Sequence, residues 1–271
     1  MPDLTILHDL NYRRVGELAL ALDLYLPAGA PPRPLVIWVH GGAWRQGSKD
    51  NPPAVPLLTD AGFAVASISY RLSQVAQFPA QIVDCKAAVA WLRAHAGEYG
   101  LAADRFGAWG SSAGGHLVAL LGVAGDRAEF QPPEWPEVST RVQAVCDWYG
   151  PTDFLQMDAH EPPGAARDHD QPDSPESQLI GGPIQANAAA VQRANPVTYV
   201  TADAPPFLVM HGTQDPLVPI HQSELLVAAL RAAGRSVEFV RLEGAGHGGP
   251  AFQRPEALAR VRAFFLEQLM A

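Results

Sequence analysis

A serine in the pattern G-x-S-x-G is the first residue whose surroundings suggest chemistry. Ser112 is the centre of the segment 110–114, after an apolar run at 105–109 and at the start of a small-residue helical pattern at 112–123. A serine at such a sharp strand-to-helix turn exposes its hydroxyl group, and the flanking glycines permit the tight backbone. The start of the helix would also favour negative charge there. We predict that Ser112 is a nucleophile; the alternative is that it only caps the helix.

An aspartate and a histidine follow later apolar runs, in the chain order that accompanies such a turn. Asp215 comes shortly after the run at 207–210, and His247 lies in a glycine-rich loop after the run at 237–242. A serine hydroxyl becomes a good nucleophile when a neutral imidazole takes its proton, and a carboxylate orients that imidazole. We predict His247 as the base and Asp215 as the acid, at the sheet edge where Ser112 lies. The competing carboxylates are Asp153, Asp203 and Glu243.

A glycine-rich loop after another apolar run could bind a developing negative charge. The segment 40–44, His-Gly-Gly-Ala-Trp, follows the run at 35–39. Bare glycines let the backbone approach a substrate oxygen, and such a loop supplies N–H groups to an oxyanion hole together with the residue after the nucleophile. We predict donors at Gly42, Ala43 and Ala113, each contributing on the order of 3 kcal/mol. A plain glycine turn is the alternative.

Aromatic residues near these positions are candidates for a substrate pocket. Trp44 ends the glycine-rich loop, and Trp148 and Tyr149 lie at the end of the apolar run at 142–148. Burial in the core is an equally good interpretation for them.

Neither a metal nor a cofactor is indicated. The tripeptide Asp168-His169-Asp170 resembles a metal cluster, but it lies in a polar loop without a second ligand group at useful spacing, so we expect it to be solvated. Cys85 and Cys146 cannot build a disulfide framework, and we expect both to be buried and inert.

The elements that must position these residues alternate along the chain. Apolar runs predict strands at 16–25, 35–39, 64–69, 105–109, 142–148, 207–210 and 237–242. Helical spacing predicts helices at 79–96, 112–123, 221–233 and 254–270, with Gly97 as one helix stop. Continuous apolar runs suit strands of a parallel sheet that is covered on both faces. Strand and helix in alternation therefore predict an α/β fold with right-handed crossovers.

Composition limits the classes of function. The chain has 271 residues, of which 48% are hydrophobic and 17% charged, so we expect one domain over 1–271 with a sizeable core. The segments 125–141 and 151–203 interrupt the alternation, and we predict that these insertions form a lid or a pocket wall. Nineteen basic and 28 acidic residues give a net charge of −9, which argues against nucleic acid and anionic membranes as partners.

The chain lacks the features of membrane insertion and export. No run approaches the roughly 18 to 20 apolar residues that a membrane span needs. The first residues show neither a basic nor an apolar region of a secretory signal. We expect a cytoplasmic protein, provided that no signal has been removed, and the sequence does not indicate an oligomeric state.

Together, the motifs at 40–44 and 110–115 resemble those of the α/β-hydrolases. Within them, the chain is similar to the esterase/lipase branch that includes feruloyl-esterase-like and acetyl-esterase-like enzymes. Further matching positions are 69–72, 78–80, 84, 174–177, 195–196, 205–207 and 211–215. The resemblance runs from about Asp23 to the C-terminus. It implies an α/β-hydrolase fold with about eight strands, and ester hydrolysis by a Ser-His-Asp triad through an acyl-enzyme without a cofactor. Ala43 stands where hormone-sensitive-lipase-like relatives carry a third glycine.

The leading hypothesis is therefore a carboxylic ester hydrolase. The resemblance suggests short-chain, acetyl or hydroxycinnamoyl (feruloyl) esters, either small or linked to a saccharide. An amide hydrolase of peptidase or arylformamidase type is one alternative, because the same triad serves it. A non-catalytic binder of small ligands is another, since fold does not fix function.

Overall fold

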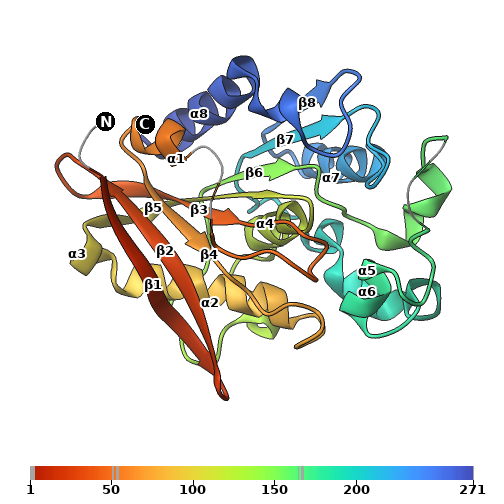
Figure 1. Ribbon diagram of the computed structural model, residues 1–271, viewed down its shortest axis with the longest axis horizontal. Coiled ribbons are helices and arrows are strands. Elements are labelled where there is room, and N and C mark those ends of the chain that lie inside the picture. The colour runs from red at the N-terminus through yellow and green to blue at the C-terminus, as the bar shows by residue number, and fades with distance from the viewer. Residues whose placement is uncertain (1–3, 51, 53–54, 164, 166–167, 271) are drawn as a thin grey trace.

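One mixed sheet of eight strands forms the centre of the computed structural model, which describes residues 4–50, 52, 55–163, 165 and 168–270 (Figure 1). From edge to edge the strands are β1 (Leu4–Val15), β2 (Leu18–Pro27), β4 (Ala64–Ile68), β3 (Arg33–Val39), β5 (Leu101–Ser111), β6 (Ala144–Trp148), β7 (Phe207–Gly212) and β8 (Val237–Leu242). β2 pairs antiparallel with β1 and β4, and every later pair is parallel. The predicted α/β-hydrolase sheet is confirmed.

Helices cover both faces of the sheet. One hydrophobic cluster joins the sheet to α2 (Ala80–Ala94), α4 (Ala113–Ala124) and α7 (His221–Ala232), and a second joins it to α1 (Val55–Thr59) and α8 (Pro255–Leu269). Alternate residues of β3 divide between the clusters: Ile37 belongs to the first, and Val36 and Trp38 belong to the second. Each fully buried side chain of this kind contributes about 1.5–3 kcal/mol. Among the described helices, none combines the length and the apolar character that a membrane crossing requires.

The hairpin of β1 and β2 departs from the prediction, which placed no strand before residue 16. β1 is mostly exposed, and its pairing with β2 shifts register between Leu7 and Leu10 and again between Asn11 and Arg13. Ion pairs hold it instead of a continuous apolar face: Arg13 lies 2.7 Å from the buried carboxylate of Asp84 on α2. A strand held in this way gives little hydrophobic signal in the sequence.

The predicted helix stop at Gly97 is wrong. After α2 the chain forms the short helix α3 (Ala96–Tyr99), which contains Gly97. The turn comes at Gly100, whose φ of 63° lies in the left-handed region that glycine adopts without strain.

Among the described residues, which exclude positions 164, 166 and 167, the two predicted insertions contain only short helices. Residues 125–141 contain η1 (Ala128–Phe130). Residues 151–203 contain η2 (Phe154–Gln156), η3 (Asp158–His160), α5 (Pro175–Ile180), η4 (Ile184–Ala186), α6 (Ala188–Ala194) and η5 (Pro196–Tyr199). In Figure 1, α5 and α6 lie together at the right of the view. Apolar residues of this segment, among them Phe154, Leu179 and Val191, belong to the same hydrophobic cluster as α4.

Candidate active site

Ser112 occupies the sharp turn between β5 and α4. Its φ of 56° and ψ of −123° put a side-chain-bearing residue in a sparsely populated region, at a cost of about 1–3 kcal/mol. Two backbone hydrogen bonds hold it there: its N–H donates to the Trp148 carbonyl (2.8 Å), and its own carbonyl accepts from the His116 N–H (3.0 Å). A Cβ atom at Gly110 would lie 2.4 Å from the Gly114 carbonyl oxygen. The glycines of the pattern are therefore required by close backbone packing.

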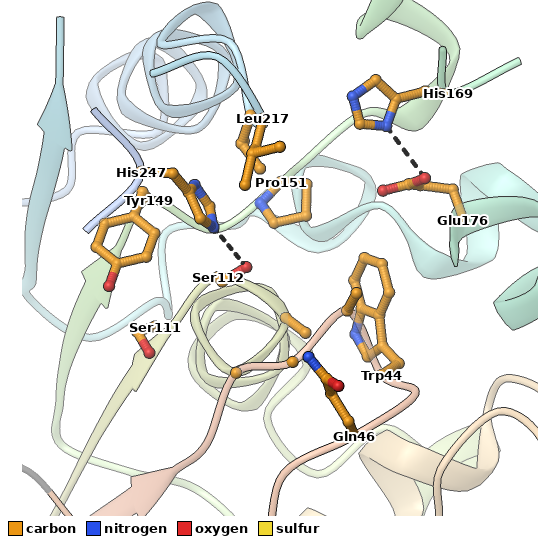
Figure 2. A pocket seen from close by; sticks show the side chains of 15 residues that line it. Trp44, Gln46, Ser111, Ser112, Tyr149, Pro151, His169, Glu176, Leu217 and His247 are labelled. Carbon is orange, nitrogen blue, oxygen red and sulfur yellow. Dashed lines mark hydrogen bonds and ion pairs between the residues drawn. The ribbon is translucent and has the colours of Figure 1, made fainter. Parts of the chain in front are cut away.

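Three side chains from separate loops form one hydrogen-bonded series. His247 Nε2 lies 2.9 Å from the Ser112 hydroxyl oxygen (Figure 2). His247 Nδ1 lies 2.7 Å from Asp215 Oδ2. Asp215 is 2% exposed, and its other oxygen accepts hydrogen bonds from the N–H groups of Leu217 (2.8 Å) and Val218 (2.9 Å). The structure thus brings together the three residues predicted to act as nucleophile, base and acid.

A second histidine supports the Asp215 carboxylate. His211, at the end of β7, is fully buried and places Nε2 3.2 Å from Asp215 Oδ2 and 2.9 Å from the Val218 carbonyl oxygen. Both of these neighbours are acceptors, so Nε2 carries the proton, and the Ser223 hydroxyl donates to Nδ1 (2.7 Å). Burial acts to raise the pKa of Asp215, but hydrogen bonds from His211 and His247 outweigh it and hold that pKa well below its ordinary value. A charged carboxylate of this kind can stabilise an imidazolium.

The loop after β3 presents backbone donors beside the serine. Gly42 and Ala43 have φ values of 112° and 54°, and the Gly42 carbonyl accepts from the N–H groups of Arg45 (3.0 Å) and Gln46 (3.1 Å). The N–H groups of Gly42, Ala43 and Ala113 donate to no other group within the described residues. All three residues line the same cavity as the serine. Their donors can therefore serve a ligand oxygen.

A cavity of about 280 Å³ opens beside these groups. Its lining comprises Gly41, Gly42, Ala43, Trp44, Gln46, Ser111, Ser112, Ala113, Tyr149, Pro151, His169, Glu176, Leu217, Val218 and His247. Trp44 and Tyr149, two of the predicted pocket residues, are among them, and burial raises the pKa of Tyr149 to about 12. Trp148 is not among these residues: it is 2% exposed and packs against Trp109 and Phe252 in the core.

His169 is placed differently from the prediction. We expected Asp168-His169-Asp170 to be solvated, but the His169 side chain is 1% exposed and lines the cavity. Its Nδ1 lies 3.1 Å from Glu176 Oε2, on α5 (Figure 2). No local pattern indicates this pair, because the burial of a polar tripeptide depends on the packing of the whole segment.

The competing carboxylates lie elsewhere. Asp153 caps η2, accepting from the Leu155 N–H (3.2 Å) and the Gln156 amide (2.7 Å). Asp203 and Glu243 are exposed. None of the three makes a hydrogen bond to His247 in the described structure.

Esterases are among the curated proteins that are similar to the chain. The chain is 36% identical to esterase LipC of Mycobacterium tuberculosis over 259 residues, which cover 93% of the chain and 62% of LipC. It is 37% identical to the probable carboxylic ester hydrolase LipM of the same organism, over 79% of the chain and 48% of LipM. The chain therefore spans about half to three fifths of the length of these relatives.

Solved structures agree over nearly the whole chain. A truncated carbohydrate esterase from gut microbiota superposes with a TM-score of 0.87 at 31% identity, covering 98% of this chain and 97% of that one. The bifunctional GH43-CE protein of Bacteroides eggerthii superposes with a TM-score of 0.85 at 35% identity, and the match covers 97% of this chain and 35% of that one. The Thermogutta terrifontis esterase Est2 with bound propionate superposes with a TM-score of 0.77 at 25% identity, and the match covers 98% of this chain and 94% of that one.

The family assignment follows from the sequence match together with the fold. A family model described as BD-FAE matches residues 22–230, a range that includes Ser112, Asp215 and the loop after β3. The chain belongs to the BD-FAE family, within the esterase branch of the α/β-hydrolases.

Proposed function

We propose that the chain is a carboxylic ester hydrolase that works through an acyl-enzyme. The observation that carries this proposal is the hydrogen-bonded series from Ser112 through His247 to Asp215, beside three backbone N–H groups that donate to no other described residue. Family membership and the esterase relatives support the same activity. Amide hydrolysis and ligand binding without catalysis gain no support from these relatives.

The distances assign a role to each group. Ser112 Oγ attacks the ester carbonyl while His247 Nε2 takes its proton. The N–H groups of Gly42, Ala43 and Ala113 bind the oxyanion of the tetrahedral intermediate, and His247 then gives its proton to the leaving alcohol. Water, deprotonated by His247, attacks the acyl-serine and releases the acid. Asp215 fixes the imidazole tautomer and stabilises its charged form throughout.

The cavity suggests a small acyl group. Its volume of about 280 Å³ lies just below the usual range for ligand pockets, about 300–1,000 Å³. Bound propionate in the similar Est2 structure supports short acyl chains, and the similar carbohydrate esterase supports a saccharide as the alcohol. We therefore favour acetyl and other short esters, with saccharide-linked acetyl esters as the substrate class and feruloyl esters as the larger variant.

The second insertion would form one wall of this pocket. Pro151, His169 and Glu176 belong to residues 151–203 and line the cavity. No residue of 125–141 is among the lining residues, so we assign the role of pocket wall to the second insertion alone, within a single domain.

Hydrolysis of p-nitrophenyl acetate, butyrate and octanoate tests the proposal. Wild type should cleave the acetate and butyrate best, and Ser112→Ala should lose about 10³-fold or more in kcat/KM. Ser48→Ala is the matched control, because Ser48 is a loop serine whose hydroxyl contacts Asp50 and does not line the cavity. An inactive wild type, or activity retained by Ser112→Ala, would contradict the proposal. Acetylated and feruloylated sugars, with p-nitroanilides beside them, then define the substrate and the bond.

A further inference from the structure

Three side chains of types that can bind a metal ion lie close together beside the cavity, and one of them, His169, also lines it. Asp158 on η3, Glu161 just after it and His169 before α5 each place one potential ligand atom within 4.8 Å of the other two. Hydrolysis by Ser112 uses none of them. Acidic surface groups gather in many proteins without binding an ion, so the case depends on His169.

His169 is a buried polar side chain whose Nε2 has no hydrogen-bond partner within the described residues. Nδ1 pairs with Glu176, whereas Nε2 and Glu161 Oε1, the atom that faces it, make no hydrogen bond there. Nε2 and this oxygen are 3.6 Å apart, which is too long for a hydrogen bond. Two ligand atoms on one tetrahedral zinc ion, each bound at about 2.0–2.2 Å, lie about 3.4 Å apart. The separation is compatible with two ligand atoms that share one cation.

Glu176 provides the outer contact that metal-binding histidines usually have. The Glu176 carboxylate lies on one side of the His169 imidazole, 3.1 Å from Nδ1, and Nε2 points away from Glu176 (Figure 2). A ligating histidine commonly directs its second N–H at a carboxylate, which fixes the tautomer and leaves the first nitrogen free for the metal. Nε2 is the nitrogen that would ligate, on the side of Glu161.

The charge around the group also favours a cation. Within the described residues, no lysine or arginine lies within ion-pair distance of Asp158, Glu161 or His169. The carboxylate oxygens of Asp158 and Glu161 lie within 4.8 Å of one another, so their negative charges repel. A bound cation would relieve this repulsion. Both carboxylates are only half-buried, which leaves a path by which an ion can reach them.

We propose that Asp158, Glu161 and His169 bind one divalent transition-metal ion, with Zn²⁺ as the preferred species. One imidazole and two carboxylates suit zinc and leave a fourth position for water. The ion would have a structural role, because it lies on the side of His169 away from Glu176 and joins η3 to the loop before α5. Binding would fix His169 and Glu176 in the cavity wall. The site stands independently of ester hydrolysis.

Zinc binding to untagged, chelator-treated protein tests the proposal by isothermal titration and thermal unfolding. Wild type should bind one Zn²⁺ per chain and unfold at a higher Tm when zinc is present. Glu161→Gln and His169→Gln should abolish both effects, and Glu176→Gln should weaken binding about 10–100-fold. Circular dichroism of the metal-free variants shows that they are folded.

Two matched controls establish that binding is specific to the three ligands. Asp173→Asn removes an exposed charge from the same segment and should bind zinc as wild type does. His160→Gln removes one ring of the stacked pair formed by His160 and His221, whose centroids are 3.4 Å apart, and should also leave binding intact. Absence of saturable binding to wild type, equal binding by His169→Gln, or loss of binding in His160→Gln would overturn the proposal.

Discussion

Tyr149 packs its ring against the imidazole of His247, with the centroids 4.6 Å apart and the planes at 63°. Phe252 supports Tyr149 from another side at 4.6 Å, and the Tyr149 N–H donates to the Met210 carbonyl (2.9 Å). The imidazole is therefore oriented by an aromatic neighbour as well as by Asp215. No property of the sequence around Tyr149 distinguished this contact from ordinary core packing.

Removal of this ring should slow catalysis. An aromatic contact of this type contributes about 0.5–1.5 kcal/mol, so Tyr149→Ala should lower kcat for p-nitrophenyl acetate by up to about tenfold. Tyr149→Phe keeps the ring and should retain most of the rate. Steady-state kinetics of the two variants decide the question, and equal losses in both would show that the hydroxyl matters instead.

Gly42 should be required for the conformation of the oxyanion loop. A Cβ atom there would lie 2.2 Å from the Gln46 carbonyl oxygen, so Gly42→Ala must displace the loop and its N–H donors. We expect kcat to fall by about 10²–10³-fold, the usual effect of losing an oxyanion donor. Gly29→Ala is the matched control, because Gly29 also has a positive φ but has open space at the Cβ position. A comparable loss of kcat in both variants would contradict this assignment.

Trp148 should matter for stability rather than for substrate binding. Its Nε1–H donates to Met210 Sδ at 3.2 Å, and its ring packs between core aromatics. Trp148→Phe should lower the free energy of unfolding by about 1–3 kcal/mol and leave KM unchanged. Urea unfolding and kinetics on the butyrate ester test both statements. A large rise in KM without a change in stability would place Trp148 in the pocket after all.

Asp147 should make the protein less stable as its carboxyl group ionises. Burial raises its pKa to about 6, while one oxygen accepts from the Gly150 N–H (2.9 Å) and the other has no hydrogen-bond partner among the described residues. The unfolded value is about 3.9, so between these values the folded state binds more protons. Stability should therefore fall, by up to about 3 kcal/mol, as the pH rises from about 4 to about 6.

Substitution of Asp147 isolates this effect. Asp147→Asn should remove that part of the pH dependence in urea unfolding, whereas Asp104→Asn, at an exposed carboxylate, should not. Parallel stability curves for wild type and Asp147→Asn would refute the assignment.

Local patterns were sufficient to predict most of the fold and the members of the hydrogen-bonded series. Parallel strands that are buried on both faces leave continuous apolar runs, so the run at 35–39 predicted most of β3, whose observed bounds are Arg33–Val39. Ser112, Asp215 and His247 each follow a strand of the sheet, and strand ends meet at one edge of the sheet. Cys85 and Cys146 are buried, free thiols, as predicted.

Features that depend on contacts distant in sequence were not predictable. β1 is held by Arg13 and Asp84, 71 residues apart, and so has no apolar pattern of its own. The segment around His169 is polar in sequence, yet packing against Glu176 buries the imidazole. His211 supports Asp215 only because β7 and the following turn bring their side chains together.

The irregular register of β1 also affects how the molecule meets its neighbours in solution. An edge strand with a regular row of unpaired N–H and C=O groups is a template on which another chain can add a strand. Here the two shifts, between Leu7 and Leu10 and between Asn11 and Arg13, interrupt that row, and the strand carries charged side chains outward. Although Leu4 and Ile6 are exposed at this edge, the broken register gives an incoming strand no continuous partner, which protects the sheet from edge-to-edge aggregation.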